Sequence, residues 1–415
     1  MTNPVAQRSA VLPLVLLVAA ILADGFDTAS LGFIVPVLSK LWGTSPAAFS
    51  IAFVATNIGA VIGYLLSGRL SARIGAARVV PLAVALYSAA VVLTVFAGSI
   101  PVLIAIRLIT GIGLGAVLPA AVSLGTALVQ PRRRPMIAII VTLGIAAGAT
   151  LSGLVGAPLI AGLGWQSAFW VPGVFALVLA PILLLVLRGI RTDARPAGSV
   201  APAGVGSLFA PGLRSATLLL WAYSFLVFIT LYLLQSWLPT LVIQYGIPVE
   251  RVSSATAAFS AGSVVGGLAL ALLSVLIPAP RIIVALSVLT GAVLVVIGAT
   301  AVPAGGLLLL VAVSGIGAAA GTNGQAGLAV ALYGEHHRTV GVGWAAAAGR
   351  IGSIVGPALG GVLLGMHAPA SSIILLTVIP VVLSIVVLLL FAAASRRSPA
   401  STADDASDEA VAVAG

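Results

Sequence analysis

The sequence of 415 residues contains no cysteine and few charged residues. Without cysteine the chain has no disulfide framework, no thiolate nucleophile and no cysteine metal site. Charged residues make up 7% of the chain, against roughly 25% in a typical soluble domain. The sequence also lacks a P-loop, an HExxH motif and a Ser/His/Asp spacing, so neither ATP hydrolysis nor an intramembrane enzyme has a basis in it. We therefore expect no enzyme activity, no cofactor and no metal.

Apolar residues make up 61% of the chain. Segments such as 11–23, 79–95 and 373–394 are nearly free of charge, and a helix needs about 20 apolar residues to cross a membrane. These segments do not alternate as the strands of a barrel do. The first one runs into Asp24 without a small-residue cleavage site, so we expect it to stay as a span. The sequence predicts an all-α integral membrane protein with 12 transmembrane helices.

The net charge of +10 indicates orientation rather than nucleic-acid binding, because the arginines are scattered between the apolar spans. With the N-terminus inside, only Lys40 and Arg251 fall in external segments. Both termini are then expected in the cytoplasm. The expected cytoplasmic basic residues are Arg8, Arg69, Arg73, Arg78, Arg132, Arg133, Arg134, Arg188, Arg191, Arg195, Arg214, Arg281, Arg338, Arg396 and Arg397.

A stretch rich in Pro, Gly and Arg, RGIRTDARPAGSVAPAGVGSLFAPGLR, separates six spans from six. We expect an N-terminal six-helix bundle over 1–187, a cytoplasmic linker over 188–214 and a C-terminal six-helix bundle over 215–395. The polar, acidic residues 396–415 are expected to form a disordered cytoplasmic tail.

The two halves resemble copies of one unit. PVLSKLWG at 36–43 matches PTLVIQYG at 239–246 with an offset of 203, and GIG at Gly111 recurs at Gly315 with an offset of 204. LVGAP at Leu154 resembles IVGP at Ile354, with an offset of 200. These matches predict two pseudo-symmetric six-helix bundles. Small residues in the fourth and eleventh spans predict close approach of neighbouring backbones.

Four ionisable residues fall at membrane depth: Asp24 and Asp27 in the first span, Arg107 in the fourth and Arg350 in the eleventh. Each costs at least ~2.5 kcal/mol to insert, so such residues usually face a cavity and are paired or functional. Two carboxylates three residues apart share one helix face and cannot both ionise cheaply, so one keeps a proton unless an arginine lies beside it. A structural salt bridge between Arg107 and Asp27 is the alternative.

Arg350 lies in the other half and needs a partner from a ligand or across the junction of the halves. A guanidinium binds a carboxylate in a bidentate fork, so an anionic substrate at this junction would supply that partner. By contrast, Glu335, His336 and His337 are expected in a solvated loop, where no further ligand completes a metal site.

Four segments carry a resemblance to a known family. They are DGFDTASLGFIVPVLSKLWG, RLITGIGLGAVLPAA, YLLQSWLPTLV and GVGWAAAAGRIGSIVGPALGG, from the first, fourth, seventh and eleventh spans. Together they resemble the aromatic acid:proton symporter family of the major facilitator superfamily. The resemblance implies a major-facilitator-type fold and alternating access. It also implies import of benzoate-like or hydroxybenzoate-like carboxylates with protons, by a monomer in the bacterial inner membrane.

The resemblance also assigns roles to residues. It places proton coupling on Asp24 and Asp27 and substrate binding on Arg107 and Arg350. Spans 1, 4, 7 and 10 are expected to line a central cavity. Its further polar or aromatic neighbours are expected to be Tyr232, Gln235, Asn323 and Gln325. One departure is Ala72, which stands where the superfamily carries an acidic residue before Arg73.

Two other functions compete with import. An exporter or proton antiporter of another small organic molecule is compatible with the same fold. A membrane receptor or scaffold is the other alternative, but it has no need for charges at the bilayer midplane. The buried arginines favour transport of an anion, because an exporter of cationic drugs is expected to hold acidic residues without Arg350.

Overall fold

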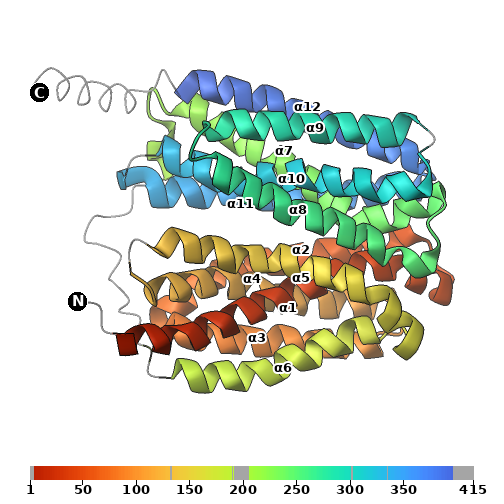
Figure 1. Cartoon of the computed structure of the whole chain (residues 1–415), viewed down its shortest axis with the longest axis horizontal. Coiled ribbons are helices and arrows are strands. Elements are labelled where there is room, and N and C mark those ends of the chain that lie inside the picture. Colours follow the sequence, from red (N-terminus) through yellow and green to blue (C-terminus); the bar gives the residue numbers. More distant parts are fainter. Residues whose placement is uncertain are drawn as a thin grey trace, which may run out of the picture.

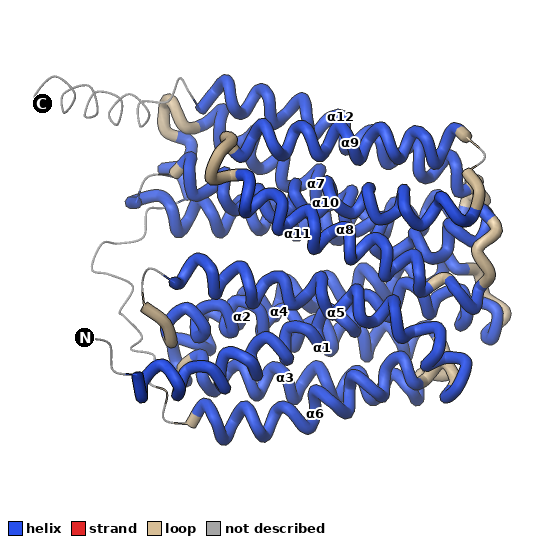
Figure 2. Tube along the Cα trace, viewed as in Figure 1, coloured by secondary structure: helices blue, strands red, loops and turns tan. Residues whose placement is uncertain are grey.

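The computed structural model of the chain describes residues 4–130, 133–188, 190, 205–300, 302–333 and 335–395. These residues form twelve long α-helices and no strand (Figure 2). The helices are α1 (Pro4–Trp42), α2 (Ser50–Ile74), α3 (Ala76–Leu93), α4 (Ile100–Ala127), α5 (Arg134–Leu163), α6 (Ser167–Leu187), α7 (Arg214–Leu241), α8 (Ser253–Leu273), α9 (Ala279–Ala299), α10 (Ala304–Leu332), α11 (Glu335–Gly365) and α12 (Ala370–Ser395).

Each helix is long and apolar enough to span a membrane. At 1.5 Å per residue, the 21 residues of α6 or α9 cover about the 30 Å of a hydrocarbon core. Backbone groups in lipid must bond within their own segment, which a helix achieves. The predicted all-α membrane fold with twelve spans is confirmed.

The start of α11 differs from the sequence prediction. Glu335, His336 and His337 begin α11 and do not lie in a loop, so that prediction is wrong. Of the expected linker, residues 189 and 191–204 lie outside the described residues, as does the whole expected tail, 396–415. The last part of the linker contains a short 3-10 helix, η4 (Val205–Phe209), and α7 begins at Arg214.

Helices α1–α6 form one half of the molecule and α7–α12 the other (Figure 1). The halves contact one another through α5 with α8, α2 with α11, and α1 with α7. We call the end where α1 begins and α12 ends the near end, and the opposite end the far end. The ribbons of the two halves lie closer together at the far end (Figure 2). There the Phe53 ring of α2 meets the Trp237 ring of α7 edge-on at 5.2 Å.

The halves repeat one another contact by contact. A Cβ atom on Gly59 of α2 would meet the carbonyl of Leu108 of α4, and one on Gly262 of α8 would meet the carbonyl of Ala312 of α10. Both partners in the second contact lie 203 or 204 positions after those in the first. The pseudo-symmetry and the close backbone approach at glycine are therefore confirmed.

The contacts also correct one of the three sequence matches. Gly148 of α5 meets the carbonyl of Leu22, and Gly352 of α11 meets the carbonyl of Phe225. By this contact, a residue of α11 lies 204 positions after its equivalent in α5. The match of Leu154 to Ile354 at an offset of 200 is therefore wrong by about one helical turn, because small residues recur at that interval along a close-packed face.

Candidate functional site

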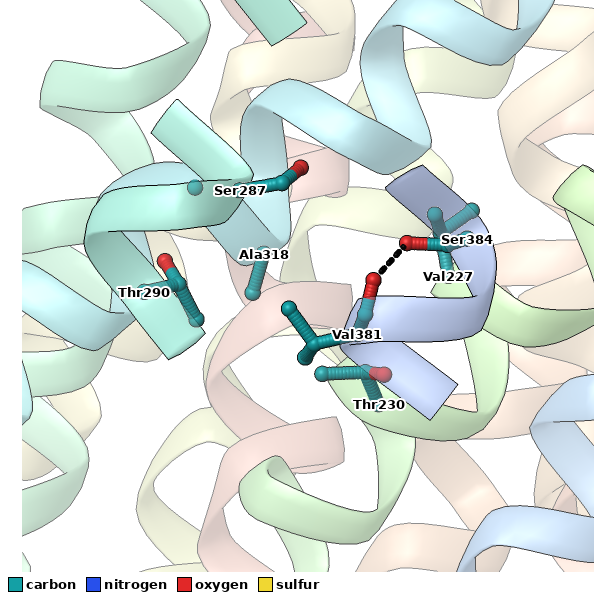
Figure 3. Close-up of a pocket in the computed structure, with 8 residues that line it drawn as sticks. Val227, Thr230, Ser287, Thr290, Ala318, Val381 and Ser384 are labelled. Carbon is teal, nitrogen blue, oxygen red and sulfur yellow. Dashed lines mark hydrogen bonds between the residues drawn. The ribbon is translucent and has the colours of Figure 1, made fainter. Parts of the chain in front are cut away.

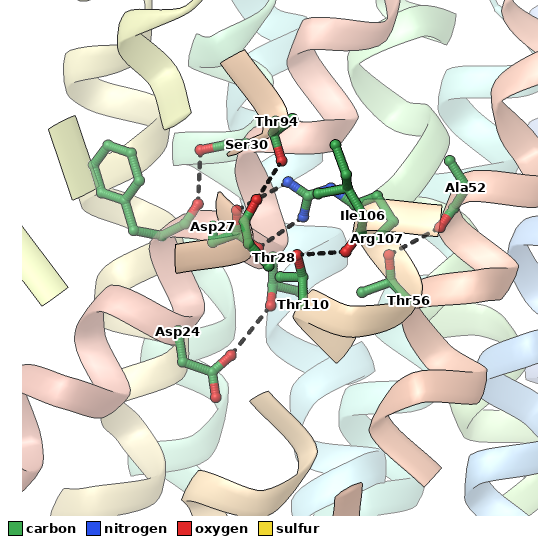
Figure 4. A network of polar contacts seen from close by, with 12 residues as sticks. Asp24, Asp27, Thr28, Ser30, Ala52, Thr56, Thr94, Ile106, Arg107 and Thr110 are labelled. Carbon is green, nitrogen blue, oxygen red and sulfur yellow. Dashed lines mark hydrogen bonds and ion pairs between the residues drawn. The ribbon is translucent and has the colours of Figure 1, made fainter. Parts of the chain in front are cut away.

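Asp27 of α1 and Arg107 of α4 form a buried ion pair within the first half (Figure 4). The two terminal guanidinium nitrogens donate to the two carboxylate oxygens at 2.8 and 3.0 Å, a bidentate arrangement. Asp27 is 1% exposed and Arg107 is fully buried. The ring of Phe169 on α6 lies 5.0 Å from the guanidinium carbon, so a cation–π contact supports the charge from a third helix.

Asp24, one helical turn before Asp27, has a different environment. Its carboxylate accepts a hydrogen bond from Thr28 of the same helix at 3.3 Å (Figure 4). No basic side chain lies within 4.0 Å of it in the described part of the chain. Asp27, three residues later on the same helix face, repels a second negative charge at Asp24. The two aspartates of one face are thus chemically unequal.

Tyr87 of α3 forms a hydrogen bond to the backbone of α1 near the aspartates. Its hydroxyl donates to the carbonyl of Ala20 at 3.1 Å, which ties α3 to α1 one turn before Asp24. The ring is 1% exposed. Sequence reasoning had no basis for choosing this tyrosine, because the residues that flank it in the sequence include no charged residue and no repeated motif.

Arg350 of α11 lies at the boundary between the halves and is partly exposed. Its guanidinium donates to the hydroxyl of Tyr232 on α7 at 3.3 Å. The guanidinium carbon lies 5.4 Å from the ring of Tyr64 on α2, a residue of the other half. Phe228 stacks on Tyr232, with ring centres 6.0 Å apart. No carboxylate of the described residues lies within 4.0 Å of Arg350.

Sequence reasoning missed two members of this aromatic cluster. The spacing of Phe228 and Tyr232, one helical turn apart, was a usable signal, because residues four apart share a helix face. Tyr64 offered none, since its approach to Arg350 depends on how α2 meets α11.

Among the described residues, the other three expected substrate neighbours form no hydrogen bond with Arg350. Gln235 lies on α7, where its carbonyl faces Gly32 of α1, and Asn323 is exposed with its amide nitrogen beside Gly267 of α8. Gln325 is buried, and its amide nitrogen has no hydrogen-bond partner among the described residues.

Comparison with known proteins gives a consistent result. A family model described as the Major Facilitator Superfamily matches residues 17–300 and 220–413. The gallate transporter of Pseudomonas putida is 31% identical over 382 residues, covering 85% of each chain. The 3-(3-hydroxy-phenyl)propionate transporter of Escherichia coli (strain K12) is 30% identical over 346 residues, or 83% of this chain and 85% of that one. The 4-hydroxybenzoate transporter PcaK of Pseudomonas aeruginosa is 29% identical over 83% of this chain and 84% of its own.

Solved structures share the fold at low sequence identity. A bacterial homolog to the human lysosomal transporter Spinster has a TM-score of 0.69 at 17% identity, covering 94% of this chain and 98% of that one. A point mutant of the nucleoside transporter NupG has a TM-score of 0.72 at 15% identity, covering 92% of this chain and 99% of its own.

Proposed function

The chain belongs to the Major Facilitator Superfamily, and on that premise we propose that it imports aromatic carboxylates together with protons by alternating access. Gallate, 4-hydroxybenzoate and 3-(3-hydroxyphenyl)propionate, for which the relatives are named, each join an aromatic ring to a carboxylate. The observation that carries the proposal is the setting of Arg350, a guanidinium at the boundary of the halves with aromatic neighbours and no carboxylate of the described residues within 4.0 Å.

In this proposal Arg350 binds the substrate carboxylate. A guanidinium at membrane depth is costly without a counterion. A carboxylate that accepts from two of the guanidinium nitrogens supplies one. Tyr64, Phe228 and Tyr232 offer aromatic faces beside it for the ring of the substrate, where offset or edge-on contacts are favourable. Because Tyr64 and Arg350 come from different halves, a bound anion contacts both.

The two aspartates take different parts. Asp27 is committed to Arg107 by two short hydrogen bonds, so we assign this pair to positioning α1 against α4. Asp24 is buried beside another carboxylate without a basic partner among the described residues, a setting in which the charged form is costly. We therefore assign the coupled proton to Asp24. Arg107 then supports the site through Asp27 and does not touch the substrate.

Asp24 of the first half and Arg350 of the second half are opposite charges at membrane depth, and this supports coupling. When a substrate anion neutralises Arg350, Asp24 loses the attraction of this charge. Protonation of Asp24 and binding of the anion at Arg350 then favour one another, which is a reciprocal coupling between two sites. A symporter needs this linkage, because the proton and the anion have to move together.

The orientation belongs to the same proposal. Basic residues such as Arg69, Arg78, Arg134 and Arg281 lie at or beside helix ends at the near end, whereas Lys40 and Arg251 lie at the far end. By the positive-inside rule the near end is cytoplasmic. The state described is then closed to the outside, and the division into bundles 1–187 and 215–395 gives the two bodies that rock against one another.

Counterflow in proteoliposomes tests the function. Vesicles loaded with unlabelled 4-hydroxybenzoate should take up labelled 4-hydroxybenzoate from outside, and Arg350→Gln should abolish the exchange while Arg251→Gln, at an exposed far-end site, leaves it unchanged. Exchange of an organic cation in place of the aromatic acid would favour the exporter or antiporter reading. No exchange of either class would contradict transport of an aromatic anion.

A further inference from the structure

A cavity lies at the far end, away from Arg350 and the aspartates. Its volume is about 510 Å³. One wall comes from the ends of α1 and α5 with Trp165. The other comes from Val249 and Glu250 of η6 (Val249–Arg251) and from the start of α8. The cavity therefore lies between the two halves, on the side where α5 meets α8.

The floor of this cavity is a tight contact between the halves. The amide of Ala157 on α5 donates to the hydroxyl of Ser253 on α8 at 3.1 Å. A Cβ atom on Gly153 would meet the backbone of Ala257. Both contacts have to separate for the far end to open. A molecule that fills the cavity touches both halves only while they are together, so it stabilises the closed far end.

The lining is apolar apart from two opposite charges and Ser253. Phe33, Val37 and Ile160 are typical of the walls, and Leu41 at the rim is 61% exposed. Lys40 comes from the first half and Glu250 from the second. Both are exposed, and they are not within 4.0 Å of one another in the part of the chain that is described.

The position of the two charges fixes their depth in the bilayer. Lys40 is two residues from the end of the span Val11–Trp42, and Glu250 is the second residue of the span Val249–Leu273. Both therefore lie at the level of the lipid headgroups, where tryptophan such as Trp165 is also enriched. The apolar walls continue from this level toward the hydrocarbon core.

We propose that this cavity binds a phospholipid with a primary-amine headgroup, its phosphate at Lys40, its ammonium at Glu250 and its acyl chain on the apolar walls. An ammonium with N–H groups donates to a carboxylate, whereas a choline headgroup has no such donor. An anionic glycerol headgroup would satisfy Lys40 and be repelled by Glu250. An aromatic carboxylate would leave Glu250 unmatched in the same way, so the charge pattern selects the zwitterionic lipid.

The test measures lipid binding and closure of the far end without measuring transport, so it does not depend on the proposed substrate. The full chain is placed in nanodiscs of phosphatidylcholine alone, or with added phosphatidylethanolamine or phosphatidylglycerol of the same acyl chains. Because the chain has no cysteine, Ala257→Cys introduces a single thiol. Ala257 lies on α8 where it packs against α5 at the far end, and it is 6% exposed in the closed state. The rate of labelling of this thiol by a maleimide that does not cross membranes reports opening.

Phosphatidylethanolamine should slow labelling about fivefold relative to phosphatidylcholine, which at 1.4 kcal/mol per tenfold is about 1 kcal/mol. Phosphatidylglycerol should not slow it. Lys40→Gln and Glu250→Gln should each remove the difference, and native mass spectrometry should show loss of the retained lipid. Arg251 lies next to Glu250 and is not part of the cavity wall. Arg251→Gln should therefore keep both the slower labelling in phosphatidylethanolamine and the retained lipid.

The double variant Lys40→Glu, Glu250→Lys should restore the preference, because the headgroup can bind in the reverse direction. Equal labelling in phosphatidylethanolamine and phosphatidylcholine would overturn the proposal. So would an effect of Lys40→Gln that is the same in both lipids, since this would indicate a direct attraction between Lys40 and Glu250. Slowing by 4-hydroxybenzoate in phosphatidylcholine alone that persists in Arg350→Gln and is lost in Lys40→Gln would assign the cavity to an aromatic acid instead.

Discussion

The two halves pack their helices in the same way and fill the equivalent site with different chemistry. By the 203 and 204 offsets, Asp27 corresponds to Thr230 and Arg107 to Val311. Where the first half holds a buried ion pair, the second holds a cavity of about 10 Å³ lined by Thr230 and other hydroxyl residues (Figure 3). The duplicated packing thus does not need the charges. Our proposal therefore predicts that the pair positions α1 against α4 for the site and is not required for the packing of the half as such.

The largest expected effect comes from breaking the pair in the first half. Asp27→Thr introduces the residue of the second half and leaves the buried Arg107 without a counterion, which should cost about 3–5 kcal/mol in the free energy of unfolding. The double variant Asp27→Thr, Arg107→Val reproduces the second half and should recover most of that loss. Thermal and denaturant unfolding of the purified protein measure both. A double variant as unstable as the single one would show that the first half requires the charges for folding.

A second large effect should separate the two aspartates. Asp24→Asn should abolish accumulation driven by a pH gradient while leaving counterflow and stability near those of the parent, because Asp24 has no ion pair to lose among the described residues. Uptake by the parent should rise as the external pH falls below the internal pH, since a proton enters with each anion. Gradient-driven accumulation by Asp24→Asn equal to that of the parent would make this aspartate structural.

The same vesicles report the number of protons. A monoanion that enters with one proton moves no net charge, so a membrane potential at equal pH should give no accumulation. One extra proton would add about 2.3 kcal/mol per 100 mV, or roughly fiftyfold accumulation. Because Asp27 is paired with Arg107, we expect one proton and no accumulation under a potassium-diffusion potential.

The next effect concerns Arg350, the charge that the second half carries at membrane depth. Arg350→Lys keeps the charge and loses the planar fork, so kcat/KM for uptake should fall about tenfold or more. Tyr232→Phe removes the hydroxyl that accepts from Arg350 and keeps the ring, so kcat/KM should fall about threefold, within the range of a single hydrogen bond. Equal uptake by Arg350→Lys and the parent would reduce the role of Arg350 to charge balance.

The sequence predicts some features of the two halves and not others. Twelve spans, the duplication and the four charges at membrane depth follow from apolar length, offset matches and the cost of burying charge. The commitment of Arg107 to Asp27, and not to Asp24, depends on how α4 faces α1, and spacing along one helix does not determine it. The ring of Phe169 contacts Arg107 and the ring of Tyr64 contacts Arg350. The sequences of α6 and α2 do not predict these contacts.

The smallest effect is expected in the hydroxyl cavity of the second half. Its volume of about 10 Å³ is close to that of one water molecule. Thr230 and Ser384 donate to carbonyls of their own helices, Leu226 at 3.2 Å and Val381 at 2.7 Å, so no charge depends on them. Hydrogen bonds between membrane helices contribute about 0.6 kcal/mol on average.

Thr230→Val keeps the shape of the side chain and removes the hydroxyl, so it should change the free energy of unfolding by about 1 kcal/mol or less. Transport should be unchanged, because the hydrogen bond of Thr230 involves neither Arg350 nor Asp24. The result should be compared with Asp27→Thr in one unfolding series, since the two changes act at equivalent positions. A loss at Thr230 as large as that at Asp27 would mean that both halves depend on polar groups at this position, and the contrast between them would then lie in charge alone.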